Sequence, residues 1–316
     1  MFEALPKAAF SVLASSLWLK RLASRYGMRR PGSFARRFIA GETVAEAIEA
    51  ARAIEAQGLT ITLDLLGESV SSGDEALRAT RAYADTVAQI EQSGVGRNIS
   101  LKLTQLGLDI DRATCVDNLR RILDVATPGG FFVRIDMENS PYTSATLDIF
   151  ETVWSIGYRN VGVVIQSYLK RSPADVEHLN AMGARVRLVK GAYREPREVA
   201  YQLKTEVDAA FIDLMRALLR NGTSPAIATH DPAMVDATRK FAADQRIPST
   251  AFEFQMLYGI RRDLQASLSA EGYPFRVYVP FGKEWFPYFM RRLGERPANA
   301  GFVLRSLFRE KQTPPR

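Results

Sequence analysis

Residues 161–190 read VGVVIQSYLKRSPADVEHLNAMGARVRLVK, a stretch that holds two β-rich runs, Val161–Ile165 and Val186–Val189, with a longer segment between them. Gly183 stands shortly before the second run. Short apolar runs that are rich in Val and Ile and bounded by glycine predict buried strands. Two strands joined by a longer crossover form a unit in which the strands are parallel and the crossover is right-handed.

The same alternation continues through most of the chain. Segments with helical periodicity, such as Asp74–Ser93 and Glu195–Asn221, separate the runs, and Gly or Pro stands at the joins. The eight predicted strands are Leu59–Leu65, Ile99–Leu103, Phe131–Asp136, Val161–Ile165, Val186–Val189, Ala226–Ala228, Thr250–Phe254 and Phe275–Val279. Eight strand–helix units predict an α/β fold of the (βα)8 TIM-barrel class. A doubly wound open sheet is the alternative.

The composition fits a folded enzyme. The chain has 316 residues, of which 47% are hydrophobic and 24% charged, so a full core can form, and α/β barrels reach this length as one domain. Its single cysteine, Cys115, excludes a disulfide scaffold and indicates a reducing cytoplasm. With only two histidines, His178 and His230, we predict no zinc or iron cluster; only an all-carboxylate metal site stays open.

The net charge of +7 lies entirely near the N-terminus. Residues 1–40 hold eight basic residues and one acidic residue, Glu3, so the rest of the chain is neutral. We therefore divide the chain into an N-terminal helical arm, residues 1–45, and a catalytic barrel, residues 46–316, that ends in an extra helix. Ala8–Leu19 is uncharged but shorter than the roughly 20 residues that span a bilayer, and its spacing predicts an amphipathic helix. The arm either packs as a solvated helix or contacts an anionic membrane; no nucleic-acid-binding motif accompanies the charge.

Polar or aromatic residues stand where the predicted strands end, and chemistry in barrels gathers at the carboxyl ends of strands. Asp136 and Arg187 lie in or at the edge of apolar runs. A charge that points into a barrel is costly unless it pairs or binds a ligand, so loop polarity explains these two residues poorly. The full set of strand-end residues is Glu68, Lys102, Asp136, Gln166, Lys190, Thr229, His230, Gln255 and Tyr278.

Several of these residues allow more than one role. Lys102 and Lys190 could form Schiff bases, as in barrel aldolases, or bind an anion, or form ion pairs. His230 could act as a base, hold a phosphate or cap the helix that Asp231-Pro232 predicts. The chain has neither a strand-to-helix G-x-G-x-x-G motif nor a Walker A motif.

A pair of arginines follows the last predicted strand. Arg291 and Arg292 share one helix face with Tyr288 and Glu295, at the spacing i, i+3, i+4, i+7. An Arg-Arg pair on a helix is most often a solvated face. Near the mouth of a barrel, however, two adjacent guanidiniums suit a carboxylate ligand.

Eight short motifs, in order along the chain, resemble those of the proline dehydrogenase family. They are Leu65-Leu-Gly-Glu68, Ser100-Leu-Lys-Leu103, Arg134-Ile-Asp-Met-Glu138, Val164-Ile-Gln-Ser-Tyr168, Arg187-Leu-Val-Lys-Gly-Ala-Tyr193, Ala228-Thr-His-Asp231, Phe252-Glu-Phe-Gln-Met-Leu-Tyr-Gly259 and Tyr288-x-x-Arg291-Arg292-x-x-Glu295. Each motif alone is weak, but eight in register are specific. The resemblance implies a distorted (βα)8 barrel that binds FAD without a Rossmann domain.

The resemblance also implies the chemistry and the site. Proline would transfer a hydride from C5 to flavin N5 and become Δ1-pyrroline-5-carboxylate. Lys102, Arg291 and Arg292 would bind the proline carboxylate, and Glu68 would pair with Arg291 over the substrate. Asp136 and Arg187 would lie near flavin N5. The substrate pocket would also hold Tyr193, Leu257, Tyr278, Tyr288 and Glu295; the FAD contacts would be Met137, Gln166, Arg187, Lys190, Gly191, Ala192, Thr229, His230 and Gln255.

Partners follow from the same resemblance. Electrons would pass to a membrane quinone, with the enzyme peripheral at the inner face of the cell membrane. Because the chain ends at Arg316, we expect a monofunctional bacterial enzyme that passes its product to a separate pyrroline-5-carboxylate dehydrogenase and binds no nucleic acid. The competing hypotheses are a Schiff-base aldolase that uses Lys102 or Lys190 and a membrane-associated scaffold.

Overall fold

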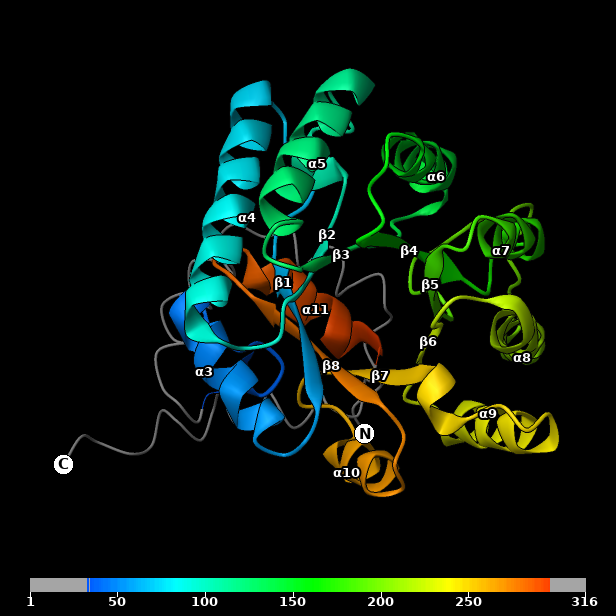
Figure 1. Ribbon diagram of the computed structural model, residues 1–316. Coiled ribbons are helices and arrows are strands. Elements are labelled where there is room, and N and C mark those ends of the chain that lie inside the picture. Colours follow the sequence, from blue (N-terminus) through cyan, green and yellow to red (C-terminus); the bar gives the residue numbers. More distant parts are fainter. Residues whose placement is uncertain (1–32, 34, 296–316) are drawn as a thin grey trace, which may run out of the picture.

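The computed structural model describes Ser33 and residues 35–295, the last five of these by their backbone alone. Eight parallel strands close into a barrel in chain order, with β1 beside β8 (Figure 1). Their bounds are β1 Thr60–Leu65, β2 Asn98–Leu101, β3 Phe132–Ile135, β4 Val161–Gln166, β5 Arg185–Val189, β6 Ala226–Ala228, β7 Glu253–Leu257 and β8 Phe275–Phe281. The predicted (βα)8 barrel is confirmed, and the open sheet is wrong.

Helices surround the barrel, and one precedes the first strand. Their bounds are α3 Val44–Glu55, α4 Gly73–Ser93, α5 Arg112–Ala126, α6 Ser140–Ser155, α7 Ser172–Ala181, α8 Lys204–Asn221, α9 Pro232–Asp244, α10 Arg262–Ala270 and α11 Trp285–Glu295, with 3-10 turns η1 Ala35–Arg37, η2 Thr104–Leu106 and η3 Ser249–Ala251. Polar caps set several starts: the side chains of Ser72, Asp111 and Asp231 accept hydrogen bonds from backbone N–H groups of α4, α5 and α9. The proposed division after residue 45 falls inside α3.

Most predicted strand bounds differ from the observed ones by one or two residues, and two predicted starts were wrong by more. The seventh strand begins at Glu253 and not at Thr250, because Pro248 is followed by the turn η3. The helix expected from Glu195 begins only at Lys204. In between, the Glu195 carboxylate accepts hydrogen bonds from the backbone and hydroxyl of Ser140, and Ala200 pairs with Leu169. The segment that precedes α8 is therefore a loop that contacts the start of α6 and the segment after β4.

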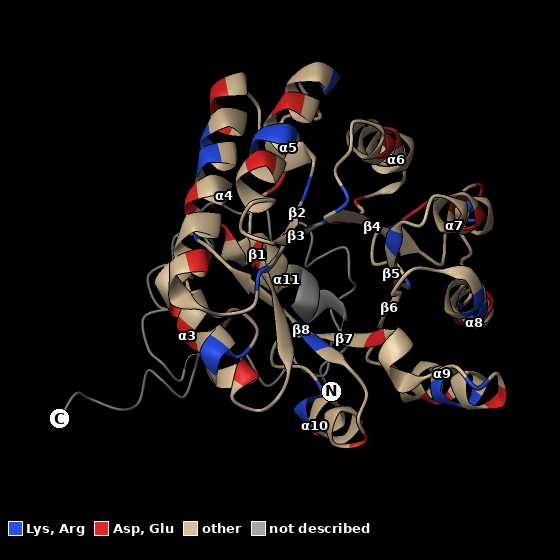
Figure 2. Cartoon of the chain, viewed as in Figure 1, with Lys and Arg blue, Asp and Glu red and all other residues tan. Residues whose placement is uncertain are grey.

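The hydrophobic core lies between the strands and the helices. Ile61 and Leu63 of β1, like Val186 and Leu188 of β5, are at most 1% exposed and belong to one apolar cluster with the helices. These residues alternate along each strand with polar ones, such as Thr62 between the two in β1. Charged residues accordingly mark the strands β5, β7 and β8 as well as the outer helices (Figure 2).

The polar residues of the strands face the interior of the barrel. Arg187 on β5 and Tyr278 on β8 both donate hydrogen bonds to Asp136, which directly follows β3. Because β3 pairs only with β2 and β4, these contacts must cross the interior. Barrel interiors are usually filled by branched apolar side chains, whereas this one holds a network of charges.

The helix α11 packs beside the carboxyl end of β1, where Leu66 follows the strand. Trp285, Phe286 and Phe289 of α11 pack with Phe38 and Ile39 in a second apolar cluster. Trp285 Nε1 also donates to Glu42 at 2.9 Å. The last residues of the predicted arm therefore pack on the barrel, while Ala8–Leu19 lies outside the described residues.

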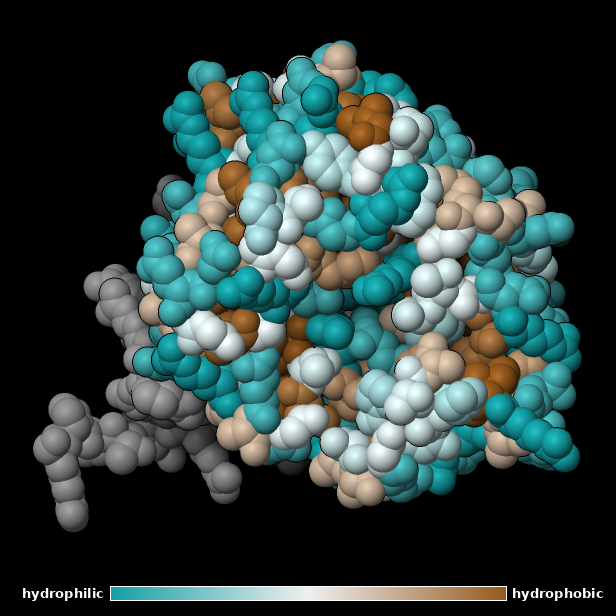
Figure 3. All heavy atoms as spheres, viewed as in Figure 1, coloured by the Kyte–Doolittle hydropathy of each residue, from teal (hydrophilic) through white to brown (hydrophobic). Residues whose placement is uncertain are grey.

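The surface is mixed in character. On the face shown in Figure 3, hydrophilic residues predominate around a central hollow, with apolar residues scattered among them. Among the described helices, none combines the length and the apolar character needed to cross a bilayer.

Candidate active site

Asp136 is the hub of the interior network. Its Oδ1 accepts hydrogen bonds from Arg187 NH1 at 2.8 Å and from Ser100 Oγ at 3.1 Å, and its Oδ2 accepts one from Tyr278 at 2.6 Å. Lys102 Nζ lies 3.5 Å from Oδ2. Burial alone would raise the pKa of Asp136, but Lys102, Arg187 and these hydrogen bonds outweigh it and lower that pKa. Asp136 is therefore ionised and holds two cations and a tyrosine in fixed positions.

Lys102 lies between two carboxylates, 3.4 Å from Asp64 and 3.5 Å from Asp136. Burial acts against the charged amine, yet the two carboxylates overcome it and raise the pKa of Lys102 well above its ordinary range. The loop after Lys102 is fastened by Glu138, which accepts hydrogen bonds from the backbone and hydroxyl of Thr104. A nucleophilic Schiff-base lysine must be neutral, so this permanent ammonium suits an anionic ligand instead.

Asp64 belongs to this cluster, and sequence reasoning missed it. Its side chain is fully buried on β1; one oxygen accepts from Lys102, and the other finds no hydrogen-bond partner among the described residues. Burial raises the pKa of Asp64. The positive charge of Lys102 opposes this effect, but the negative charge of Asp136 adds to it, and the pKa remains raised. An Asp within the run Leu63-Asp64-Leu65 carries the same signal that singled out Asp136 and Arg187.

Arg187 is fixed from two further sides. Its Nε donates to Gln255 Oε1 at 2.6 Å, and its guanidinium lies 5.2 Å from the centre of the Tyr278 ring. Burial and the charge of Asp136 raise the pKa of Tyr278 well above its ordinary value, so this phenol remains a neutral hydrogen-bond donor. Gln255 lies inside β7 and not at its end, and its contacts are to Arg187 and Glu253.

Another predicted group lies at the carboxyl ends of β3 to β6 and on the loops that follow them. Gln166 Nε2 donates to the Met137 carbonyl at 3.4 Å, while Gln166 Oε1 is buried without a partner among the described residues. Gly191 has a φ of +104°, and a Cβ there would stand 2.5 Å from the Tyr168 ring, so only glycine fits. Ala192, next to it, is exposed.

Lys190 and the residues after β6 are joined by hydrogen bonds. Lys190 Nζ donates to Asp208 at 2.5 Å and to Asp231 at 2.7 Å. His230 Nε2 accepts from the backbone N–H of Leu257 at 2.9 Å, which joins the ends of β6 and β7 and places the ring proton on Nδ1. Asp231, and not His230, caps α9, and Thr229 accepts from the Asp231 backbone.

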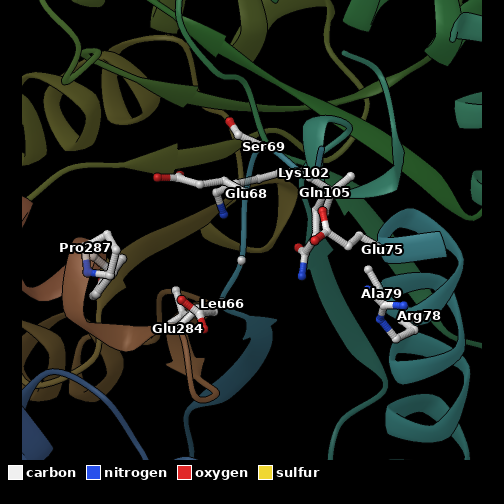
Figure 4. A pocket seen from close by; sticks show the side chains of 13 residues that line it. Leu66, Glu68, Ser69, Glu75, Arg78, Ala79, Lys102, Gln105, Glu284 and Pro287 are labelled. Atoms are coloured by element: carbon white, nitrogen blue, oxygen red, sulfur yellow. The ribbon is translucent and has the colours of Figure 1, made fainter. Parts of the chain in front are cut away.

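The mouth of the barrel opens into a cavity of about 470 Å³ beside α11 (Figure 4). Lys102, Glu68 and Tyr288 all line this cavity, together with the N-terminal part of α4. Tyr193 is close enough to Lys102 to contribute to its raised pKa. The backbone of Arg291, Arg292 and Glu295 lies on α11, in the turns that follow Tyr288. The predicted Glu68–Arg291 pair lies outside the described side chains and stays a prediction.

The comparisons with known proteins identify the family of this barrel. The sequence model of the family described as proline dehydrogenase matches residues 47–305. The chain therefore belongs to the proline dehydrogenase family.

Two curated relatives match over all or nearly all of their length. Proline dehydrogenase 2 of Bacillus subtilis is 40% identical over 298 residues, which cover 94% of this chain and 97% of that protein. The proline dehydrogenase of Deinococcus radiodurans is 39% identical over 316 residues, with 98% and 100% covered.

Solved structures agree on the fold. The proline utilization A protein of Bdellovibrio bacteriovorus, inactivated by N-propargylglycine, superposes with a TM-score of 0.78 at 29% identity. The match covers 88% of this chain and 34% of that longer one, so the chain spans about a third of its length.

Proposed function

We propose that this proline dehydrogenase uses FAD to oxidise L-proline to Δ1-pyrroline-5-carboxylate and passes the electrons to a membrane quinone. The observation that supports it most is the buried cluster in which Asp136 holds Lys102, Arg187 and Tyr278 at the carboxyl end of the barrel. It combines a cation for a carboxylate with a rigid polar surface for a cofactor. Cys115, in contrast, is buried with a pKa raised to about 12, mainly by burial, and offers no thiolate.

The residues after β3 to β6 fit a flavin. The buried Gln166 Oε1 lacks a donor, and flavins carry an N–H group that hydrogen-bonds to such acceptors. Gly191 has no side chain where the chain passes Tyr168, which permits a close approach of the backbone to a ligand. Lys190 and His230 add polar groups beside them. We propose that these residues hold FAD with Met137, Arg187, Ala192, Thr229 and Gln255.

When bound, the flavin accepts the hydride that proline loses. The protein positions the reactants. The Lys102 ammonium, fixed by Asp64 and Asp136, binds the proline carboxylate, and we propose that Arg291 and Arg292 complete this contact from α11. Arg187 contributes a fixed positive charge that stabilises negative charge developing on the cofactor. The wall of the pocket that excludes water is proposed to contain Tyr193, Leu257, Tyr278, Tyr288, Glu68 and Glu295.

The proposed setting is the inner face of the cell membrane. The basic residues between 1 and 40 would attract anionic lipids, as in the peripheral attachment of other basic amphipathic segments. The imine product would pass to a separate pyrroline-5-carboxylate dehydrogenase, and no nucleic-acid partner is proposed.

The test is spectroscopic. We expect the purified protein, after reconstitution with FAD, to show flavin absorbance that L-proline bleaches without oxygen and that a soluble quinone restores. A protein that binds no FAD, or whose flavin proline leaves oxidised, contradicts the proposal. The aldolase hypothesis predicts instead that borohydride traps a carbonyl substrate on a lysine, and the charged state of Lys102 argues against it.

A further inference from the structure

A second polar cavity lies at the opposite, amino-terminal end of the barrel. We call it the floor cavity; Asn98, Phe132, Arg134, Arg185, Glu253 and Arg276 line it, and its volume is about 130 Å³. These residues stand at or near the first residues of β2, β3, β5, β7 and β8. Cofactor sites usually measure roughly 300–1,000 Å³, so this cavity suits a much smaller ligand.

Arg134 is a buried cation without a matching anion. It is 4% exposed, and its NH1 donates to the backbone carbonyls of Val163 and Arg185 at 3.0 and 2.5 Å. Within the described part of the chain it forms no ion pair. Burial and the charges of Arg187 and Arg276 lower the pKa of Arg134 well below its ordinary value, and the carboxylates of Glu253 and Asp136 offset this only in part. Arginine nevertheless stays charged in proteins. A buried charge of this kind is unfavourable unless a counter-ion accompanies it.

The fold holds Arg134 in this position. A Cβ on Gly162 would lie 2.7 Å from Arg134 NH1 and 2.9 Å from the Phe132 ring, so glycine leaves the room that both side chains occupy. The guanidiniums of Arg134 and Arg185 lie 4.8 and 5.2 Å from the centre of the same Phe132 ring. Two positive groups thus meet at one aromatic side chain.

The carboxylate nearest to this arginine pair is already engaged. Glu253 accepts two hydrogen bonds from Arg276 Nε, at 2.9 and 3.1 Å, and one from Gln255. Arg185 has no ion pair or hydrogen bond of its side chain among the described residues. Three guanidiniums against one carboxylate leave the floor cavity with a net charge of +2.

We propose that the floor cavity binds a small oxyanion, of the class of inorganic phosphate, between Arg185 and Arg134, with Arg276 as the third cation. Planar guanidiniums bind oxyanions through paired, charge-assisted hydrogen bonds. Asn98 adds a donor, because its Oδ1 accepts from Thr62 and its Nδ2 has no hydrogen bond within the described residues. The site would be separate from the active site and linked to it through Glu253, Gln255 and Arg187.

Thermal unfolding of the FAD-loaded protein in increasing inorganic phosphate tests the proposal, with sodium chloride keeping the ionic strength constant. FAD is kept saturating so that its own phosphate groups fill their site. A ligand that binds only the folded state raises the midpoint, and we expect a saturable rise of roughly 2–6 °C.

Two variants and a control locate the site. Arg185→Gln, on an exposed residue, should weaken the apparent phosphate affinity by about 10-fold or more. Glu253→Gln should tighten it while lowering the starting midpoint, because Arg276 then lacks its carboxylate. Arg120→Gln, on an exposed arginine of α5 that pairs with Asp117 and interacts with Tyr158, lies outside the floor cavity and should leave the response unchanged. No saturable rise, or an equal response in Arg185→Gln, would overturn the proposal.

Discussion

Replacing Asp136 by asparagine should destabilise the folded protein by about 3 kcal/mol. The buried cluster holds two cations, Lys102 and Arg187, and two carboxylates, Asp64 and Asp136, so it is electrically neutral. The substitution leaves it with a net charge of +1. Removing one partner of a buried ion pair costs about 3–5 kcal/mol, and the lower end applies here because Asp136 keeps 12% of its side chain exposed.

Asp64→Asn is the informative comparison. Its second oxygen is buried without a hydrogen-bond partner among the described residues. Burial also raises the pKa of Asp64 while that of Asp136 is lowered, so the charge of Asp64 is held less favourably than that of Asp136. Lys102 keeps Asp136 as a counter-ion in this variant. We therefore expect a loss below about 1 kcal/mol, in the range of an ordinary hydrogen bond. The two aspartates contact the same lysine, but their replacement by asparagine should reduce the stability of the folded protein by different amounts.

The effect should also depend on pH. The pKa of Asp136 is lowered in the folded state, so its contribution is present above the ordinary value of about 3.9 and disappears as the pH falls through the folded value. The stability difference between the wild type and Asp136→Asn should therefore be full at pH 7 and shrink below about pH 4. Asp64, whose pKa is raised, works in the opposite sense: its contribution is complete below 3.9 and is lost as the pH rises through the folded value.

Urea unfolding followed by tryptophan fluorescence measures these differences. Asp213→Asn, on an exposed residue of α8 whose one ion pair within the described part of the chain is with Arg216, is the control and should stay within about 0.5 kcal/mol of the wild type. If Asp64→Asn cost as much as Asp136→Asn, or if Asp136→Asn behaved like the control, Asp136 would not be the hub of the cluster.

Four further predictions concern the ligands. Arg291→Met should raise the KM for proline by about 10-fold or more, since a charge-assisted contact contributes about 1.5–3 kcal/mol; an unchanged KM in steady-state assays would contradict the clamp. Gly191→Ala should weaken FAD binding in fluorescence titrations, because the new Cβ meets Tyr168, whereas Gly272→Ala, with a similar φ and open space, should not. Tyr288→Ser should improve the relative kcat/KM for 4-hydroxyproline by enlarging the pocket, and an unaltered preference would refute this role. Deleting residues 1–40 should reduce sedimentation with anionic liposomes, and equal sedimentation would favour the solvated helix.

The strand order was predictable because apolar runs and glycines recur at each unit. β6 was placed with its observed bounds, Ala226–Ala228, because Pro225 precedes it and Thr229 ends the run. β7 was misplaced by three residues. Phe252 precedes the strand and Phe254 lies within it, so the apolar pattern alone does not show where the strand begins. Bounds of this kind depend on how the turn after Pro248 packs, which local sequence does not specify.

The candidate site was predictable as a set of residues but not as a network. Asp136 and Arg187 were found because charges in apolar runs demand partners, and Lys102 was found because it stands at the end of a predicted strand. Which charges pair depends on closure of the barrel, which brings β3, β5 and β8 together across the interior. For the same reason the ion pairs of Lys190 with Asp208 and Asp231, from distant segments, could not be read from spacing.

The two faces of a barrel strand have different roles: the outer face packs in the hydrophobic core, and the inner face carries the polar side chains of the candidate site. In β1 the residues Ile61 and Leu63 join the core, while Thr62 and Asp64 point to the interior. Alternation of this kind usually indicates a half-exposed antiparallel strand, yet the barrel buries both faces. The polar face is tolerated because its charges pair across the interior and because the helices supply the hydrophobic core outside. A register slip of one residue would exchange the two faces of a strand, so the apolar core also fixes which side chains the active site receives.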